Sequence, residues 1–139
     1  MGKFNEAVFK AAKMLLKVSP LIFGTVLLVS LIVTLIPNSF YLKIFTKNIF
    51  FDSFIGSLIG SISAGNPITS YILGGELLSQ GVSLIAVTAF LVAWVSVGIV
   101  QLPAESMILG KKFAIFRNIF SFVFAIIVAL ITILILGAF

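Results

Sequence analysis

Long apolar runs alternate with short polar breaks along the chain, and this pattern predicts an all-α protein. The runs at 19–36, 82–102 and 118–136 are each close to the length of about 20 residues that crosses a bilayer core as a helix. The stretch 49–80 is also apolar, but Gly65-Asn66-Pro67 interrupts it. The pattern therefore predicts a polytopic integral membrane protein, with three to four transmembrane helices in one membrane domain over residues 1–139.

The segment 3–17 has a different pattern, because apolar residues at helical spacing alternate with charged ones. The charged face carries Lys3, Glu6, Lys10, Lys13 and Lys17. This pattern predicts an amphipathic helix that lies in the membrane interface with its lysines toward the headgroups. The alternative, with equal weight, is a basic flank of the first span, whose helix Pro20 is suited to start.

The break inside 49–80 predicts a pair of short helices. Asn66 is a strong N-cap residue and Pro67 suits the first helical position, so a helix should restart at Pro67 and continue to about Ser79. Such a helix is about 20 Å long, which is too short to span comfortably. The pair resembles a discontinuous or re-entrant helix, a feature that marks binding sites in transporters. The alternative is an ordinary interfacial loop between two full spans.

Small residues recur three or four positions apart before this break. They are Ser53, Gly56, Ser57, Gly60, Ser61 and Ala64. Small residues at this spacing let helix backbones approach closely in lipid. We interpret them as a helix-packing face in preference to a ligand site.

The composition narrows the class of protein further. Of the 139 residues, 61% are hydrophobic and only 9% are charged, whereas a soluble domain carries about 25% charged residues. The absence of Cys and His excludes thiol nucleophiles, disulfides, the usual zinc sites and imidazole acid–base chemistry. We therefore expect no enzyme activity, no metal and no cofactor. The net charge of +5 favours contact with anionic lipid over nucleic acid.

Two acidic residues lie in apolar surroundings, Glu76 and Glu105. An ionisable side chain at membrane depth is costly and usually marks the path of a solute or a proton. Gln101 lies four residues before Glu105 and shares its predicted helix face. The alternative is that Glu105 lies at the water interface and pairs with Lys111 or Lys112.

The helix that restarts at Pro67 should present free N–H groups and a positive dipole end, which favour an anionic or polar group. The backbone carbonyls of Ala64 and Gly65 would be available as acceptors. The predicted substrate-binding or coupling residues are Asn66, Pro67, Ser70, Glu76, Gln101 and Glu105.

Lys and Arg are enriched on the cytoplasmic side of membrane proteins, so their distribution can indicate the orientation of the chain. Here the distribution leaves the orientation open. With four spans, one side holds four basic residues (Lys3, Lys10, Lys13 and Lys17) and the other holds five (Lys43, Lys47, Lys111, Lys112 and Arg117). Such a chain would insert both ways. With a re-entrant pair at 49–80, the count becomes seven against two and fixes one orientation. Either way, one copy is too small to enclose a polar pathway, so we expect an oligomer.

Residues 50–139 resemble one half of the predicted permeases that include the organoarsenical efflux permeases. The resemblance rests on Gly, Pro and small residues in the run 60–103, on the segment 108–118 and on the final apolar span. Full-length members resemble two related halves of inverted topology. The resemblance therefore implies half of an inverted repeat, which two antiparallel copies would complete. Many members carry a cysteine-containing motif where this chain has Ala64-Gly65-Asn66-Pro67, so thiol-based recognition of arsenic or mercury is not carried over.

These features favour a homodimeric permease of the cell membrane that moves a small polar or charged solute, with Glu76 or Glu105 binding a cation or a coupling proton. The alternative is a non-transporting membrane scaffold or an accessory subunit of a larger membrane complex. A small multidrug-type exporter is disfavoured, because its key acid lies in an early span and the span 19–36 has none.

Overall fold

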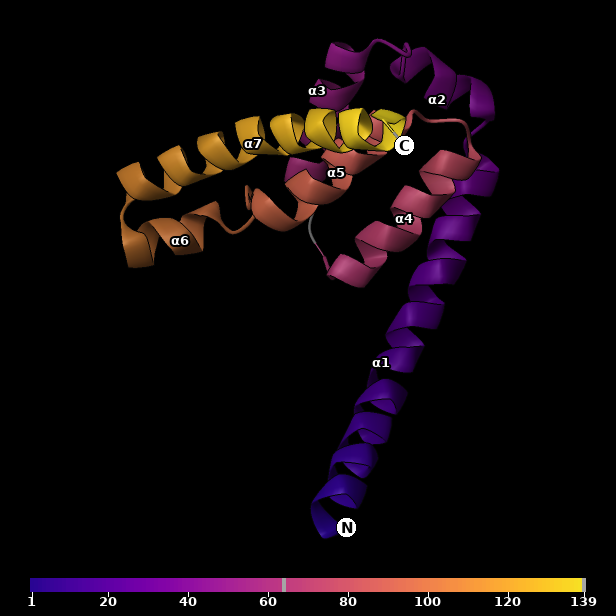
Figure 1. The fold of residues 1–139 in the computed structure, drawn as a ribbon, viewed down its shortest axis with the longest axis vertical. Coiled ribbons are helices and arrows are strands. Elements are labelled where there is room, and N and C mark those ends of the chain that lie inside the picture. The colour runs from indigo at the N-terminus through magenta and orange to yellow at the C-terminus, as the bar shows by residue number, and fades with distance from the viewer. Residues whose placement is uncertain (64, 139) are drawn as a thin grey trace. The chain divides into compact units, whose positions relative to one another are not determined.

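A computed structural model describes residues 1–63 and 65–138, and this part of the chain is entirely helical apart from its connections (Figure 1). The helices are α1 (Gly2–Leu35), α2 (Asn38–Ile44), α3 (Ile49–Ile62), α4 (Pro67–Ser79), α5 (Leu84–Ser96), α6 (Leu102–Leu109) and α7 (Lys111–Ala138). The predicted all-α class is confirmed.

The chain divides into two compact units, and the first is the single helix α1. Residues 3–17 and 19–36 belong to one continuous helix of 34 residues with Pro20 in its interior, which fits the alternative of a basic flank of the first span and not a separate helix that starts near Pro20. No turn-forming residue separates the two predicted segments, so their helical patterns continue into one another. Pro20 removes one backbone hydrogen bond from the helix without ending it.

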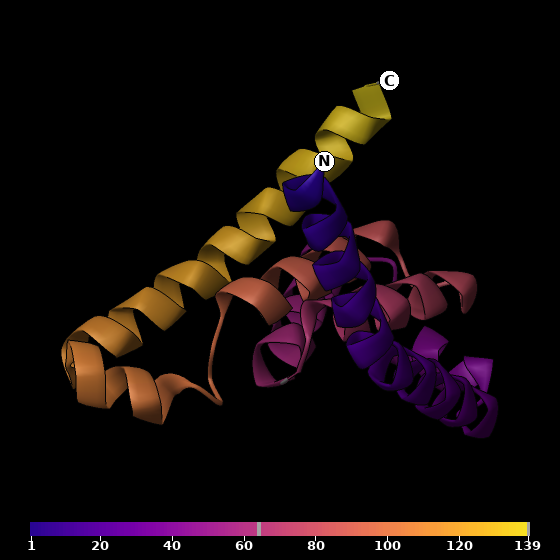
Figure 2. The same cartoon turned by 90° about the horizontal axis from the view of Figure 1, so that it is seen from below.

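The second unit begins at Ile36 and is built around α5. Helices α3, α4 and α7 pack against α5, and α6 packs against α7 (Figures 1 and 2). The buried face of α5 consists of Ile85, Ala86, Val87, Ala89, Phe90 and Ala93. Helix α2 contributes Tyr41 to the same core. This central position of α5 fixes where its C-terminal end lies relative to its neighbours.

Helices α3 and α5 make the closest contact in this unit. A Cβ atom at Gly56 would overlap the backbone carbonyl of Ala86, and one at Gly60 would overlap that of Phe90. The small residues Ser53, Ser57 and Ser61 are also buried on α3. Those members of the predicted packing face therefore allow helix contact, as predicted, whereas Ala64 lies outside the described residues.

The buried carboxylate of Asp52 joins the start of α3 to the start of α5. It accepts hydrogen bonds from the Thr46 backbone N–H at 3.0 Å and from the Ser83 hydroxyl at 2.6 Å. Ser83 is the N-cap residue of α5. A buried carboxylate needs such donors, so this contact holds the two helix starts together.

The predicted 21-residue span 82–102 is corrected to a 13-residue helix followed by a second break. Helix α5 ends at Ser96, the backbone turns through 97–101, and α6 begins at Leu102. Gly98 and β-branched neighbours favour non-helical backbone here, and Pro103 suits the start of α6. All the residues of 97–100 are apolar or Gly, so hydropathy alone does not reveal the break.

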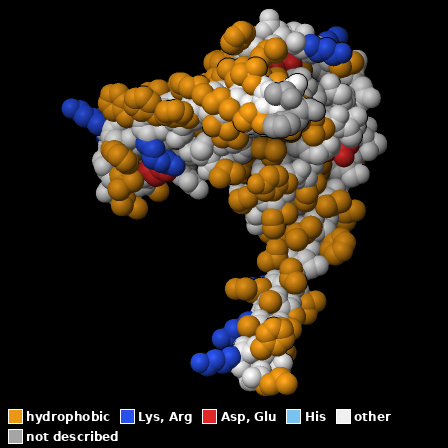
Figure 3. All heavy atoms as spheres, viewed as in Figure 1, with side chains coloured by type: hydrophobic (Ala, Val, Ile, Leu, Met, Phe, Trp, Pro, Cys, Tyr) orange, Lys and Arg blue, Asp and Glu red, His pale blue; other side chains and the backbone are white. Residues whose placement is uncertain are grey.

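Two helices, Gly2–Leu35 and Lys111–Gly137, are long and apolar enough to cross a membrane by length and composition. Helix α7 extends seven residues further toward the N-terminus than the predicted span 118–136. Apolar side chains cover much of the outer surface of α7 (Figure 3). This surface is compatible with a membrane protein.

Candidate binding cavity

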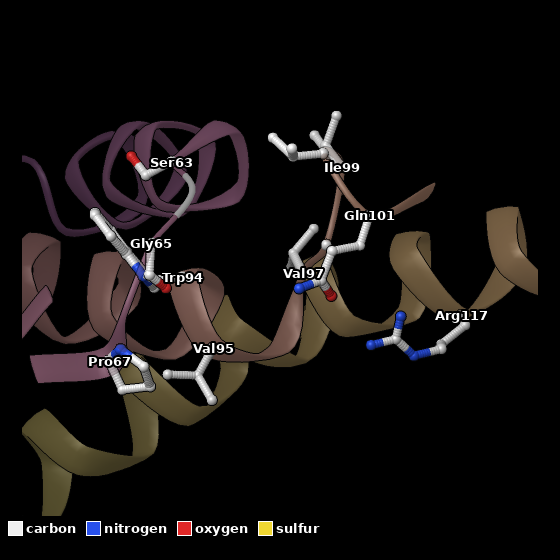
Figure 4. Close-up of a pocket in the computed structure, with 11 residues that line it drawn as sticks. Ser63, Gly65, Pro67, Trp94, Val95, Val97, Ile99, Gln101 and Arg117 are labelled. Atoms are coloured by element: carbon white, nitrogen blue, oxygen red, sulfur yellow. The ribbon is translucent and has the colours of Figure 1, made fainter. Parts of the chain in front are cut away.

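The two helix breaks line one cavity of about 260 Å³ (Figure 4). Ser63, Gly65 and Pro67 contribute from the break between α3 and α4, and residues 97–101 contribute from the break between α5 and α6. Trp94 of α5 and Arg117 of α7 also line the cavity. The cavity therefore lies where two interrupted helices meet.

Asn66 determines the geometry of the first break, because it caps α4. Its side-chain oxygen accepts a hydrogen bond from the Ile68 N–H at 2.9 Å, and its backbone carbonyl accepts one from the Thr69 N–H at 2.9 Å. The Ser70 hydroxyl donates to the Pro67 carbonyl at 2.6 Å. The predicted cap is confirmed, but the expectation of free N–H groups is wrong for Ile68 and Thr69, because Asn66 already bonds to both.

Trp94 covers the same break from α5. Its indole N–H donates to the Gly65 carbonyl at 3.4 Å, and a Cβ atom at Gly65 would lie 3.3 Å from the indole ring. Gly65 has φ of +153°, which favours glycine. The Gly65 carbonyl, an expected acceptor for solute, is therefore bonded to Trp94, and that of Ala64 lies outside the described residues.

Helix α7 bonds to the backbone groups that the second break frees. The buried Asn118 side chain accepts a hydrogen bond from the Gly98 N–H at 2.8 Å. The Arg117 guanidinium donates to the Ser96 carbonyl at 3.3 Å. Such bonds are required wherever a helix is interrupted away from water, so two adjacent residues of α7 stabilise the break.

The same two residues hold Glu105 of α6. Arg117 Nη1 lies 2.5 Å from Glu105 Oε1 and 2.6 Å from Oε2, and Asn118 Nδ2 donates to Oε2 at 3.2 Å. The alternative pairing of Glu105 with Lys111 or Lys112 is corrected to Arg117. The Glu105 side chain is 18% exposed and that of Arg117 is 35% exposed. Arg117 lies on the cavity wall, so the cavity has an ion pair at its edge.

The structure brings together only some of the predicted site residues. Pro67 and Gln101 line the cavity, and Glu105 reaches it through Arg117. Asn66 and Ser70 bond to the first turn of α4. Glu76 does not join the site: it lies near the opposite end of α4 and accepts hydrogen bonds there from Ser79 at 3.1 Å and Gln80 at 3.2 Å.

Arg117 and Asn118 are the main residues that the sequence interpretation missed as site residues. Arg117 entered only the count of charges, because it stands at the edge of a long apolar run. A signal was present: an acid in apolar surroundings needs a cation, and Arg117 follows Glu105 by 12 residues.

No group of three or more potential Asp, Glu, His or Cys metal ligands occurs within residues 1–63 and 65–138. Comparisons with protein-family models, with curated proteins and with solved structures found no match.

Proposed function

We propose that this protein is a membrane permease that works as a homodimer in the cell membrane and moves a small polar or charged solute. One observation carries the proposal: two helix breaks face a common cavity whose wall includes a paired arginine. The second unit also contains a helix, α7, with the length and composition of a membrane span.

The physical argument starts from the cost of interrupted helices in a bilayer. Backbone that leaves the helix at membrane depth is tolerated only where it is buried in protein or lines a water-filled cavity. Transporters use this arrangement, because broken helices expose polar backbone where solute binds. Two breaks at one cavity are therefore better explained by solute binding than by a purely structural scaffold.

The helix lengths support a re-entrant α3–α4 pair. Helix α3 has 14 residues and α4 has 13, so each is about 20 Å long, against about 30 Å for a bilayer core. In this arrangement the membrane is crossed beside α7 by a single unit that consists of α5, the second break and α6. The solute pathway through one copy is then open toward the lipid, and a second copy closes it.

The antiparallel arrangement of the two copies follows from the resemblance to a half permease. It requires the chain to insert in both orientations. A re-entrant pair places seven basic residues on one side and two on the other, which opposes dual insertion. The orientation must therefore be measured together with the topology.

Sided thiol labelling measures both, because the chain contains no cysteine. Lys3→Cys and Lys112→Cys are introduced singly and treated with an impermeant reagent in intact and in lysed cells. Partial labelling of each site from outside, completed by lysis, supports the antiparallel homodimer. Labelling of each site wholly from one side contradicts it and points to a partner chain that supplies the missing half.

Transport is tested in vesicles that contain the purified protein, by flux of radiolabelled organic anions, organic cations and amino acids. Glu105→Gln should reduce flux of the transported solute, because it removes the charge that pairs with Arg117. Glu76→Gln is the matched control, since Glu76 lies away from the cavity and should leave flux unchanged. No flux for any solute, together with copurification of another membrane protein, would favour an accessory subunit.

A further inference from the structure

We propose that the transported solute is a small organic anion, and that its acidic group binds Arg117 in exchange for Glu105. The inference rests on the proposed function and adds the chemical class of the solute. It is carried by the position of the ion pair at the cavity wall, where one partner lines the cavity and the other lies behind it.

Arg117 is the only charged side chain among the described residues that line the cavity. Its guanidinium extends from α7 toward Gln101 (Figure 4). Glu105 is not part of the lining and is the less exposed partner of the pair, at 18% against 35%. A solute that enters the cavity therefore meets the cation first. A guanidinium presents a planar set of N–H donors that matches carboxylate, phosphonate and sulfonate groups.

The rest of the cavity favours an anion that also has a short apolar body. Trp94, Val95 and Ile99 contribute apolar side chains to the lining. The volume of about 260 Å³ corresponds to the space of roughly nine water molecules in the liquid. A carboxylate with a chain of a few carbon atoms fits this space.

Glu105 acts as a substitute ligand for Arg117 when the cavity holds no solute. Leaving a partly buried guanidinium without an anion is costly. Exchange of one carboxylate for another avoids that cost, because Arg117 stays paired throughout. Glu105 also accepts a hydrogen bond from Asn118, so Arg117 is not its only donor. Glu105 is the only charged side chain of α5 and α6, so no second acid on these helices competes with the solute for Arg117.

Binding can be measured on the full-length protein in detergent, because Trp94 is the only tryptophan and lines the cavity. Butyrate and propylphosphonate serve as anion probes, and tetraethylammonium as the cation control. We expect a saturable change in Trp94 fluorescence with at least one anion and none with the cation.

Four variants separate the roles of the pair. Arg117→Gln should weaken anion binding by about tenfold or more, which corresponds to a loss of one charge-assisted contact. Glu105→Gln should retain or strengthen binding, because no carboxylate then competes with the solute for Arg117. The double variant E105Q/R117Q removes both charges, so it should fold without an unpaired buried ion and should not bind. Lys112→Gln is the exposed control and should bind like the unmodified protein.

The outcomes show separately whether the anion inference fails and whether the permease function fails. Absence of binding for both anions, equal response to anion and cation, or binding by a folded E105Q/R117Q overturns the anion inference. A different result is transport of another solute, with a flux that butyrate and propylphosphonate do not inhibit. That result supports the permease function but overturns the anion inference. Anion binding without flux of any solute in vesicles supports the anion site and overturns the permease.

Discussion

Asn118 shows how much of the candidate site depends on one side chain. Its amide accepts a hydrogen bond from the Gly98 N–H and donates to Glu105 and to the Ala114 carbonyl. It therefore joins α7 to both sides of the second break. An amide suits this place because it offers an acceptor and two donors without adding charge.

Replacing Asn118 should destabilise the protein. Asn118→Leu has a similar volume but leaves the Gly98 N–H without its side-chain partner, at a cost of about 2 kcal/mol. The expected result is a lower melting temperature in detergent, followed by circular dichroism. Asn5→Leu on the exposed part of α1 is the control and should melt like the unmodified protein. Equal melting of both variants would contradict the role of Asn118.

Asp52 provides a second prediction at this scale, because it is fully buried and its two oxygens have different donors. Asp52→Ala leaves the Thr46 N–H and the Ser83 hydroxyl without that acceptor and opens space. We expect a destabilisation of about 2 kcal/mol or more, measured as above. Glu6→Ala is the matched control, since the pair of Glu6 with Lys10 is exposed and such pairs contribute little. The idea fails if Asp52→Ala melts no earlier than Glu6→Ala.

Local sequence chemistry predicted the first break well and the site cation poorly. Asn66 and Pro67 act within their own helix turn, so neighbouring residues suffice to identify the cap. Arg117 reaches Glu105 across a turn between two helices, so the sequence indicates that Glu105 needs a cation without identifying which one. Ion pairs of this kind depend on tertiary structure.

At the scale of elements, the span 82–102 shows the limit of hydropathy. The residues of 97–100 are apolar or Gly, so the run is continuous in composition although the helix is not. Hydropathy measures the preference for an apolar environment, whereas the helix depends on backbone conformation. Gly98 and Pro103 were the available signals, and Pro103 marks a new helix start, not the fading end of the span.

The glycines of α3 give a prediction at this scale. Gly56→Ala and Gly60→Ala each place a Cβ atom against a carbonyl of α5, which should force the two helices apart and cost at least about 2 kcal/mol. Gly75→Ala is the matched control in α4, because nothing lies within 4 Å of its Cβ position. It should leave stability unchanged or raise it by up to about 1 kcal/mol. Thermal melting in detergent measures this difference: Gly56→Ala and Gly60→Ala should each melt at a lower temperature than Gly75→Ala.

At the scale of the whole molecule, the question is which helices cross the membrane. Helix α7 passes the test of length and composition, and Phe124 near its middle is 58% exposed on the protein surface. If lipid covers this face, Phe124→Cys in vesicles should resist a hydrophilic thiol reagent and react after denaturation. Lys112→Cys should react without denaturation. Rapid labelling of Phe124→Cys in intact vesicles would contradict a membrane position for α7.

The contact of α3 with α5 has a mechanical consequence for any transport cycle. No side chain separates the two backbones at Gly56 and Gly60, so the helices cannot slide past one another without collision. They form a stiff frame. We therefore expect any transport motion in α4 and α6, whose connections to neighbouring helices contain the positive-φ glycines Gly65, Gly81 and Gly110. Both helix breaks line the cavity, so we expect small rotations of α4 and α6 to change its width.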